Sequence, residues 1–316
     1  MKKILIIGST GQIGSELSIK LRSIYGESNV VCGYFAPPFP ENFFEAGPTE
    51  EINALEKEQI ASVVKKYNID TIYNLAAILS ATAEKNPKLG WDVGVGSLMN
   101  CLDVAKEYKC SVFTPSSIGA FGPETPRDKT PQDTIQRPKT VYGITKVLGE
   151  LISDYYFQHW GIDTRSVRFP GIISNLTPPG GGTTDYAVEI FYKAIKGEKF
   201  VCPLKAGTFM DMMYMPDALD AAVNIMEADA SKLIHRNAFN VTAMSFDPEM
   251  LLAEIRKHLP NFQMTYEIDP LKQSIADSWP NSLDDSCAKN EWNWQSKFNL
   301  ETMTADMLAN LREKQK

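Results

Sequence analysis

The 316-residue sequence predicts an α/β protein in which a doubly wound parallel sheet is followed by a smaller carboxy-terminal region. Short runs of branched apolar residues alternate with longer segments of helical periodicity, and such alternation implies right-handed crossovers between parallel strands. Beyond Pro170, glycine and proline cluster at 178–182 and the alternation weakens. We therefore expect a Rossmann-type domain at 1–170 and a second region at 171–316, of which residues 214–243 return to the first domain.

The chain opens on a short strand followed by a helix. Residues 3–7 form a branched apolar run that ends at Gly8, as expected of a strand buried on both faces. The segment 11–26 has apolar residues at helical spacing and so predicts an amphipathic helix. Its apolar face is expected to consist of Ile13, Leu17, Leu21 and Ile24, and its outer face to carry Lys20 and Arg22.

The same alternation predicts the remaining elements of the first domain. Short branched runs indicate strands, and apolar residues spaced three or four apart indicate helices. Strands are expected at 30–32, 71–75, 111–114 and 164–169, and helices at 56–67, 92–108 and 142–160. In the helix at 56–67, Ile60, Val63 and Val64 should face inward.

Composition and charge exclude several classes of function. Hydrophobic residues make up 43% of the chain and charged residues 22%, close to the average of globular proteins. The formal net charge of -7 leaves no basic field for nucleic acid or an anionic membrane surface, so neither is an expected partner. The apolar run at the start is too short for a signal peptide or a membrane span, and a cytoplasmic location is expected.

Cysteine and histidine usage predicts neither a disulfide framework nor a metal site. The five cysteines are odd in number and show no CxxC spacing. His159, His235 and His258 lie far apart in the sequence and have no paired ligand at metal-binding spacing. We therefore expect no metal.

A glycine motif follows the first strand. Gly8, Gly11 and Gly14 form GxxGxxG at the start of the first helix, where backbone N–H groups and the helix dipole can hold a pyrophosphate. A plain strand-to-helix turn would also use glycine. The position at the start of a βαβ unit favours dinucleotide binding.

The second strand carries an unusual signal for cofactor choice. Dinucleotide-binding domains commonly place an acidic residue at its end, where it accepts hydrogen bonds from the ribose 2′-hydroxyl of NAD. Residues 30–37 contain neither Asp nor Glu, and Tyr34 stands where that residue is expected. The same stretch has no Arg or Lys to meet a 2′-phosphate, so NAD is expected over NADP.

Ser117, Tyr142 and Lys146 form the sharpest catalytic pattern. Tyr142 and Lys146 are four residues apart and so share one helix face. A tyrosine can act as a base near neutral pH only when a neighbouring cation favours the phenolate, and Lys146 supplies that cation. A Tyr-x-x-x-Lys spacing also arises by chance, from packing beside a lysine that reaches the surface.

Several longer stretches point to one family: SSIGAFGPETPR, QRPKTVYGITKVLGE, VRFPGIIS, PGGGTTDYAVEIFY and DSWPNSLDDSCAKNEWNW. Together they resemble the L-threonine 3-dehydrogenases of the extended short-chain dehydrogenase/reductase superfamily. The PGGGTTDYAVEIFY stretch discriminates most, because the sugar epimerases and dehydratases of the superfamily do not carry it. The similarity covers nearly the whole chain.

This resemblance implies NAD-dependent oxidation of the L-threonine 3-hydroxyl to 2-amino-3-oxobutyrate. Tyr142 would be the general base, Ser117 would orient the hydroxyl, and Lys146 would lower the tyrosine pKa, with Ser116 a structural neighbour. The implied cofactor-binding residues are Gly8, Gly11, Gln12, Ile13, Gly14, Tyr34, Asn53, Leu75, Ala76, Ala77, Tyr142, Lys146, Phe169 and Ile172. The implied substrate-binding residues are Ser80, Ser117, Tyr142, Gly182, Thr183, Thr184 and Trp279.

Three positions depart from the family pattern. Tyr34 replaces the ribose-binding aspartate, and Asn53 replaces an aspartate near the adenine. Gly94 replaces an asparagine, and we expect it to change the order of a loop near the site more than the chemistry. The resemblance also implies a homodimer, in which the helix at 142–160 would pair across a two-fold axis through Val147, Leu148, Leu151 and Ile152.

Two alternatives share some of these residues. A nucleotide-sugar epimerase or dehydratase of the same superfamily would need basic or aromatic residues to hold a diphosphate. A non-catalytic dinucleotide-binding module would be expected to lack Tyr142 or Lys146, and both are present.

Overall fold

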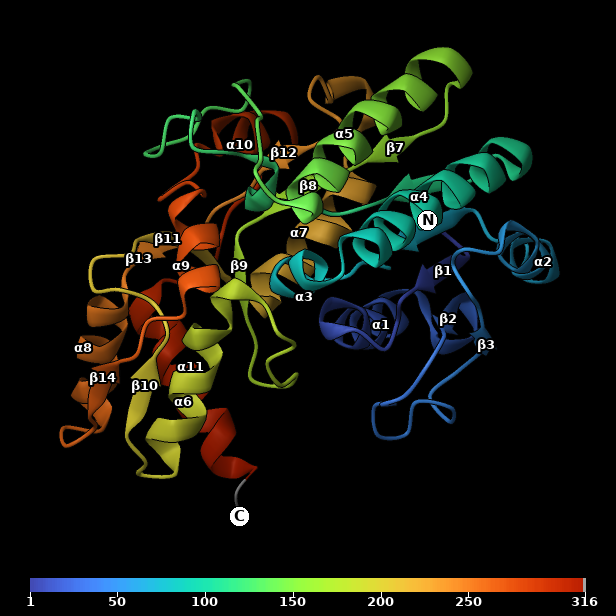
Figure 1. Ribbon diagram of the computed structural model, residues 1–316. Coiled ribbons are helices and arrows are strands. Elements are labelled where there is room, and N and C mark those ends of the chain that lie inside the picture. Colours follow the sequence, from blue (N-terminus) through green and yellow to red (C-terminus); the bar gives the residue numbers. More distant parts are fainter. Residues whose placement is uncertain (315–316) are drawn as a thin grey trace.

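The computed structural model describes residues 1–314, and at its centre lies a six-stranded sheet whose strand pairs are all parallel (Figure 1). The strand order is β3-β2-β1-β4-β5-β7, so the order reverses between β1 and β4. The strands are β1 (Ile4–Ile7), β2 (Val30–Tyr34), β3 (Thr49–Glu51), β4 (Thr71–Asn74), β5 (Ser111–Phe113) and β7 (Thr164–Arg165). The predicted doubly wound parallel sheet is confirmed.

Helices cover both faces of this sheet because its strands are apolar on both sides. In β1, Ile4 and Ile6 belong to one buried cluster, and Leu5 and Ile7 belong to another. The first cluster includes residues of α1 (Gln12–Tyr25) and α7 (Met215–Glu227). The second includes residues of α2 (Lys57–Tyr67), α4 (Pro87–Tyr108) and α5 (Val141–Trp160). In α2 the predicted inward residues Ile60, Val63 and Val64 are buried.

The prediction for the faces of α1 is wrong at two positions. Leu17 and Leu21 are fully buried, but Ile24 is 48% exposed. Because the inner face continues at a spacing of four, Tyr25 packs against the core in place of Ile24. Arg22 is also buried, since the segment between β2 and β3 crosses it and the Pro48 carbonyl accepts a hydrogen bond from its Nη2 at 3.1 Å.

The strand expected at 164–169 is divided in the structure. Residues 164–165 form β7, whereas β8 (Val167–Phe169) leaves the large sheet and pairs with β6 (Ser116–Ser117) and β12 (Phe239–Asn240). Two short elements, β3 and α3 (Ser80–Lys85), have no counterpart among the predicted elements. They are too short to show a period in the sequence.

The carboxy-terminal elements build a second core, which Figure 1 shows at the lower left in yellow to red. Tyr186, Phe191 and Phe246 are fully buried there. Its elements are β9 (Gly171–Ile173), α6 (Tyr186–Ile195), β10 (Phe200–Cys202), β11 (Met210–Tyr214), β13 (Met244–Phe246), α8 (Pro248–His258), β14 (Met264–Tyr266), α9 (Pro270–Asp277) and α11 (Leu300–Glu313). The short helix α10 (Ser286–Trp292) lies beside β12 instead. Division of the chain at residue 170 stays a prediction.

Within residues 1–314, no helix has both the length and the apolar character that crossing a membrane would require.

Candidate active site

A cleft of about 390 Å³, partly open to solvent, lies at the carboxyl ends of β1 and β4. This is the edge of a parallel sheet, at the point where the strand order reverses, where such folds bind ligands. The cleft brings together most of the predicted site residues: Gly8, Gly11, Gln12, Ile13, Gly14, Leu75, Ala77, Ser80, Ser117, Tyr142, Lys146, Phe169, Ile172, Gly182, Thr183, Thr184 and Trp279. Tyr34, Asn53 and Ala76 are not among its lining residues.

The glycines after β1 allow α1 to begin close to the sheet. Gly8 has a φ of +79°, which favours glycine, and a Cβ there would lie 3.0 Å from the Leu75 carbonyl carbon. A Cβ on Gly14 would lie 2.2 Å from the Gly8 oxygen. Any side chain at either position would push the helix away from the strand.

The start of α1 fits the pyrophosphate of a dinucleotide. The helix begins after Gly11 with no side-chain cap and no acidic residue in its first turn, so its N–H groups are available to an anion. The Gln12 Nε2 atom is buried and finds no hydrogen-bond partner among the described residues. A buried amide donor beside a bare helix N-terminus is a suitable contact for phosphate oxygens.

Tyr34 and Asn53 do not line the cleft, and both contact their own loops. The Tyr34 ring packs edge-on against Phe39, Phe43 and Phe44, with centroids 5.4, 5.9 and 5.4 Å away. Asn53 turns back on its own loop, where its Oδ1 accepts the Leu55 N–H at 3.0 Å. The aromatic packing is tertiary, so the alternation of strands and helices did not predict it.

Tyr142 sits in the first turn of α5, and Ser117 ends β6 opposite it. Thr140 caps the helix, its Oγ1 accepting the Gly143 N–H at 3.0 Å. Burial raises the pKa of Tyr142, and hydrogen bonding with the Ser117 hydroxyl lowers it. Gly119 admits the Tyr142 ring, because a Cβ there would lie 3.0 Å from a ring carbon.

Lys146 lies one turn along α5 and is half-buried. Its Nζ donates to the Pro115 carbonyl at 2.8 Å and lies 5.3 Å from the centroid of the Tyr142 ring. Burial lowers the pKa of Lys146 to about 8, although the charge of Glu150 acts in the opposite direction. The ammonium form therefore predominates at neutral pH and is lost as the pH rises past about 8.

Glu150 is a site residue that the sequence reasoning missed. Its carboxylate is almost fully buried and accepts two hydrogen bonds from Arg168, at 2.8 and 2.9 Å. Ser116 donates to the same carboxylate, which agrees with its predicted structural role. Glu150 comes four residues after Lys146 and so shares the helix face of Tyr142 and Lys146. This spacing was the available signal for it.

The glycine-rich segment after β9 is held by a buried carboxylate. Asp185 Oδ2 accepts the N–H groups of Gly181 and Gly182 at 2.6 and 2.8 Å, and burial raises the Asp185 pKa. Asp185 also lines the cleft, and the sequence reasoning had not assigned it a role. Ser80 Oγ and Thr183 Oγ1 lie 3.3 Å apart on this wall.

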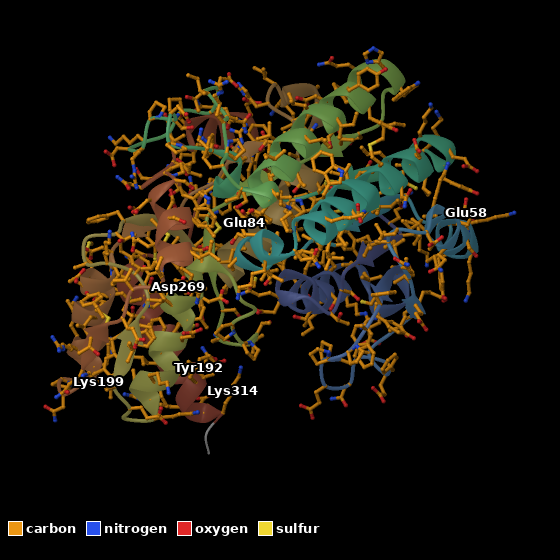
Figure 2. All side chains as sticks on the ribbon, viewed as in Figure 1. Glu58, Glu84, Tyr192, Lys199, Asp269 and Lys314 are labelled. Carbon is orange, nitrogen blue, oxygen red and sulfur yellow. The ribbon has the colours of Figure 1, made fainter. Side chains whose placement is uncertain are left out.

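The helix α3 that carries Ser80 is tied to the start of α5. Glu84, labelled near the middle of Figure 2, accepts the Val141 N–H at 2.7 Å. This contact joins the wall that bears the predicted substrate residues to the turn that bears Tyr142. Trp279, from the end of α9, is 5% exposed and closes the same side of the cleft.

Gly94 lies inside the continuous helix α4, so the expected effect on a loop is wrong. A Cβ at this position would lie 3.0 Å from Thr145 Oγ1 on α5. The glycine therefore allows close packing of the two helices. Gly94, Ala76 and Lys146 all line a much smaller cavity of about 30 Å³.

The chain is similar to known proteins over its whole length. A family model described as the NAD dependent epimerase/dehydratase family matches residues 4–241. A curated protein from Staphylococcus saprophyticus, called an uncharacterized epimerase/dehydratase, is 51% identical over 316 residues, which cover 100% of this chain and 99% of that protein.

Two solved structures are also close in fold and sequence. The X-ray structure of an L-threonine dehydrogenase from Clostridium difficile is 54% identical with a TM-score of 0.97, and the match covers 99% of this chain and 98% of that one. The holo form of a GalE-like L-threonine dehydrogenase from Cupriavidus necator is 48% identical with a TM-score of 0.95, covering 98% and 99%.

Proposed function

The chain belongs to the NAD dependent epimerase/dehydratase family, and from this premise we propose that it is an L-threonine 3-dehydrogenase that uses NAD. The reaction would convert the L-threonine 3-hydroxyl to the ketone of 2-amino-3-oxobutyrate. One observation carries the proposal: a single cleft holds Ser117, Tyr142 and Lys146 together with the glycine-rich segment 180–184. Similarity to the two L-threonine dehydrogenases over nearly the full chain supports it.

The chemistry divides between the cofactor and three side chains. When bound, the nicotinamide ring accepts the hydride from C3 of the substrate. Tyr142 takes the proton of the 3-hydroxyl, and Ser117 holds that oxygen in line with the tyrosine. The Lys146 ammonium stabilises the phenolate form of Tyr142. The substrate thus loses its proton to Tyr142 and its hydride to the nicotinamide ring.

The residues that would hold the pyrophosphate and the adenine ribose of the cofactor carry no charge. The N–H groups after Gly11 and the Gln12 amide would bind the pyrophosphate. Near the ribose, Tyr34 is in contact with the aromatic rings of Phe39, Phe43 and Phe44, which offer nothing to neutralise a 2′-phosphate. We therefore assign NAD over NADP.

The cleft suits a small substrate better than a nucleotide sugar. Among its lining residues in the described part of the chain, Lys146 is the only Lys or Arg, and it faces Tyr142. A sugar nucleotide would need further donors for its diphosphate. The hydroxyls of Ser80 and Thr184 instead offer short donors to an amino-acid carboxylate.

We assign a homodimer on the outer face of α5. Ile144, Val147, Leu148, Leu151 and Tyr155 line an open apolar groove there, and the Leu151 side chain is 63% exposed. Apolar residues recurring on the outer side of a long helix are typical of a helix-to-helix interface between two copies of a chain.

The direct test is NADH formation, followed by absorbance, with L-threonine, L-serine, 2-butanol and a UDP-sugar as substrates. We expect L-threonine to exceed L-serine moderately and 2-butanol to be almost inert, because a pocket built to pair polar groups rejects an analogue that lacks them. Parallel assays with NADP test the cofactor assignment. Turnover of the UDP-sugar without net NADH would overturn the proposal in favour of an epimerase.

A substrate-pocket variant extends the same test. Thr184→Val removes a hydroxyl from the cleft wall, and we expect it to raise KM for L-threonine more than it changes NAD binding. Thr265→Val, on the remote strand β14, is the matched control and should leave both unchanged. An unaltered KM in Thr184→Val would show that the glycine-rich segment is only a turn.

A further inference from the structure

A cluster of metal-ligating side chains lies outside the cleft, where α10 meets the segment that leads into β12. Cys287 and Glu291 stand one turn apart on α10, and His235 approaches them from that segment. Asp133, from the loop before α5, lies on the other side of the His235 ring. None of the four lines the candidate active site.

The ligand atoms of three of these residues are already close together. One atom each from His235, Cys287 and Glu291 lies within 4.8 Å of the others. His235 Nδ1 is 2.5 Å from Glu291 Oε1, and His235 Nε2 is 3.2 Å from Asp133 Oδ2. The His235 side chain is 23% exposed and that of Glu291 8%, so an ion from solvent could reach a partly enclosed site.

The backbone holds the Glu291 carboxylate in place for this geometry. Its Oε2 accepts the N–H groups of Ile234 and His235, at 2.5 and 3.1 Å. Oε1 therefore stays directed at the imidazole. Hydrogen bonds that fix a ligand in this way are a regular feature of metal sites in proteins.

Two carboxylates face the cluster and favour a cation there. Glu291 contacts one nitrogen of the His235 imidazole, and Asp133 contacts the other. A divalent ion bound beside Glu291 would balance part of this negative charge.

We propose that His235, Cys287 and Glu291 bind Zn²⁺, with Asp133 accepting the hydrogen bond from the other imidazole nitrogen. One thiolate, one imidazole and one carboxylate form a donor set typical of zinc, and water would complete the tetrahedron. Bonds of about 2.0 Å place two tetrahedral N and O ligands about 3.3 Å apart, so the imidazole and the carboxylate must separate slightly. Binding releases the proton of the thiol and any proton on His235 Nδ1, because the thiolate and the neutral imidazole are the ligands.

This site was not foreseen because its members are far apart in the sequence. Only Cys287 and Glu291 share an element, and a single pair four residues apart is a weak signal. The pairing of β12 with β8, and the packing of α10 beside β12, bring His235 to them. The proposal does not depend on the function proposed above, and its test uses no enzyme activity.

The test is titration of the full chain, freed of metal by a chelator, with Co²⁺ alone as a spectroscopic probe. We expect a thiolate-to-cobalt charge-transfer band and the visible bands of tetrahedral Co²⁺, saturating at one ion per chain and displaced by Zn²⁺. Cys287→Ser should abolish the charge-transfer band, and His235→Gln and Glu291→Gln should weaken binding at least tenfold. Asp133→Asn should weaken it about tenfold, the effect expected of an outer partner.

Matched controls separate the site from general effects. His159→Gln changes an exposed histidine elsewhere and should bind Co²⁺ as the unaltered chain does. Zn²⁺ should raise the melting temperature of the unaltered chain but not that of Cys287→Ser, whose circular dichroism without metal should be unchanged. Absence of a charge-transfer band, or its persistence in Cys287→Ser, would overturn the proposal.

Discussion

Tyr142 and Lys146 lie side by side and half-buried, and burial disfavours the charged form of each. It raises the pKa of the phenol and lowers the pKa of the ammonium to about 8. The two charges are opposite, so each makes the other less costly when they occur together. At the scale of residues, base catalysis therefore depends on the pair, and the two members should fail differently when they are replaced.

Replacing Tyr142 should remove proton transfer and leave binding intact. We expect Tyr142→Phe to lower kcat by about 10²- to 10⁴-fold, the usual loss for a general base, because the ring is kept and only the hydroxyl is lost. Cofactor affinity, measured by titration, should stay close to its original value. Turnover at the original rate would rule out Tyr142 as the base.

Replacing Lys146 should change the pH dependence. Without the cation, burial still raises the pKa of Tyr142 and no neighbouring charge favours the phenolate, so the rise of activity with pH should move to higher pH in Lys146→Ala. Lys146→Arg keeps a cation and should restore part of the shift. The measurement is kcat/KM across the neutral to alkaline range, and identical profiles for Lys146→Ala and the unaltered enzyme would contradict the pairing.

The residues of the site were predictable to the extent that their signals are local. The spacing of four residues on one helix predicted the pair Tyr142 and Lys146. The position of the GxxGxxG motif directly after a strand predicted its role. The burial of Arg22 and the Glu150–Arg168 pair each arise from a segment distant in the sequence, and the packing of Tyr34 arises from the fold of the irregular loop that follows β2. A single sequence carries no pattern for such contacts.

At the scale of elements, Asp211 on β11 joins three segments of the second core. It is fully buried, and its carboxylate accepts hydrogen bonds from the Thr242 hydroxyl at 2.7 and 2.8 Å and from the Leu283 N–H at 2.7 Å. Burial raises the pKa of Asp211 to about 8. The folded protein therefore retains a proton at this group that the unfolded chain, with a pKa near 3.8, gives up.

Asp211 should make the folded protein less stable as the pH rises. Between pH 3.8 and about 8 the folded state binds more protons than the unfolded state, so the free energy of unfolding falls with increasing pH. The slope is at most about 1.4 kcal/mol per pH unit. The contribution of Asp211 to the free energy of unfolding is fully present below pH 3.8 and is lost as the pH rises through about 8.

Asp211→Asn should flatten this dependence, because the amide cannot ionise. We expect the variant to be less stable than the unaltered chain at acidic pH and to approach it as the pH rises, as measured by urea unfolding across the window. Asp128→Asn, at an exposed carboxylate, is the control and should retain the original slope. Equal slopes in Asp211→Asn and the unaltered chain would assign the dependence to other groups.

Most long periodic elements were predicted with small errors at their ends, whereas the shortest were missed. The exception is α4, which was expected to begin at residue 92 and begins at Pro87. The helices α1, α2 and α5 begin within a residue or so of the expected positions. The strand β3 and helix α3 have three and six residues, too few to show a period. The break after Arg165 that separates β7 from β8 follows from pairing with β6 and β12, which is tertiary.

At the scale of the molecule, the outer face of α5 is expected to join two copies of the chain. Leu151→Glu places a charge in the apolar groove and should convert a dimer to a monomer, as measured by sedimentation equilibrium. Burying a leucine contributes about 1.5 to 3 kcal/mol, and a symmetric interface loses that amount twice. Ile24→Glu, at an exposed apolar residue of α1, is the control. A Leu151→Glu variant of unchanged mass would contradict the assignment.

The central claim is that this cleft removes a hydride from C3 of L-threonine and a proton from its hydroxyl. The most direct measurement uses L-threonine with deuterium at C3 and analyses the reduced cofactor by mass spectrometry. The account predicts one deuterium in each reduced cofactor and equal amounts of reduced cofactor and ketone. In Tyr142→Phe, formation of the labelled cofactor should fall together with turnover. A reduced cofactor without deuterium, or deuterium that stays on the substrate, would contradict it.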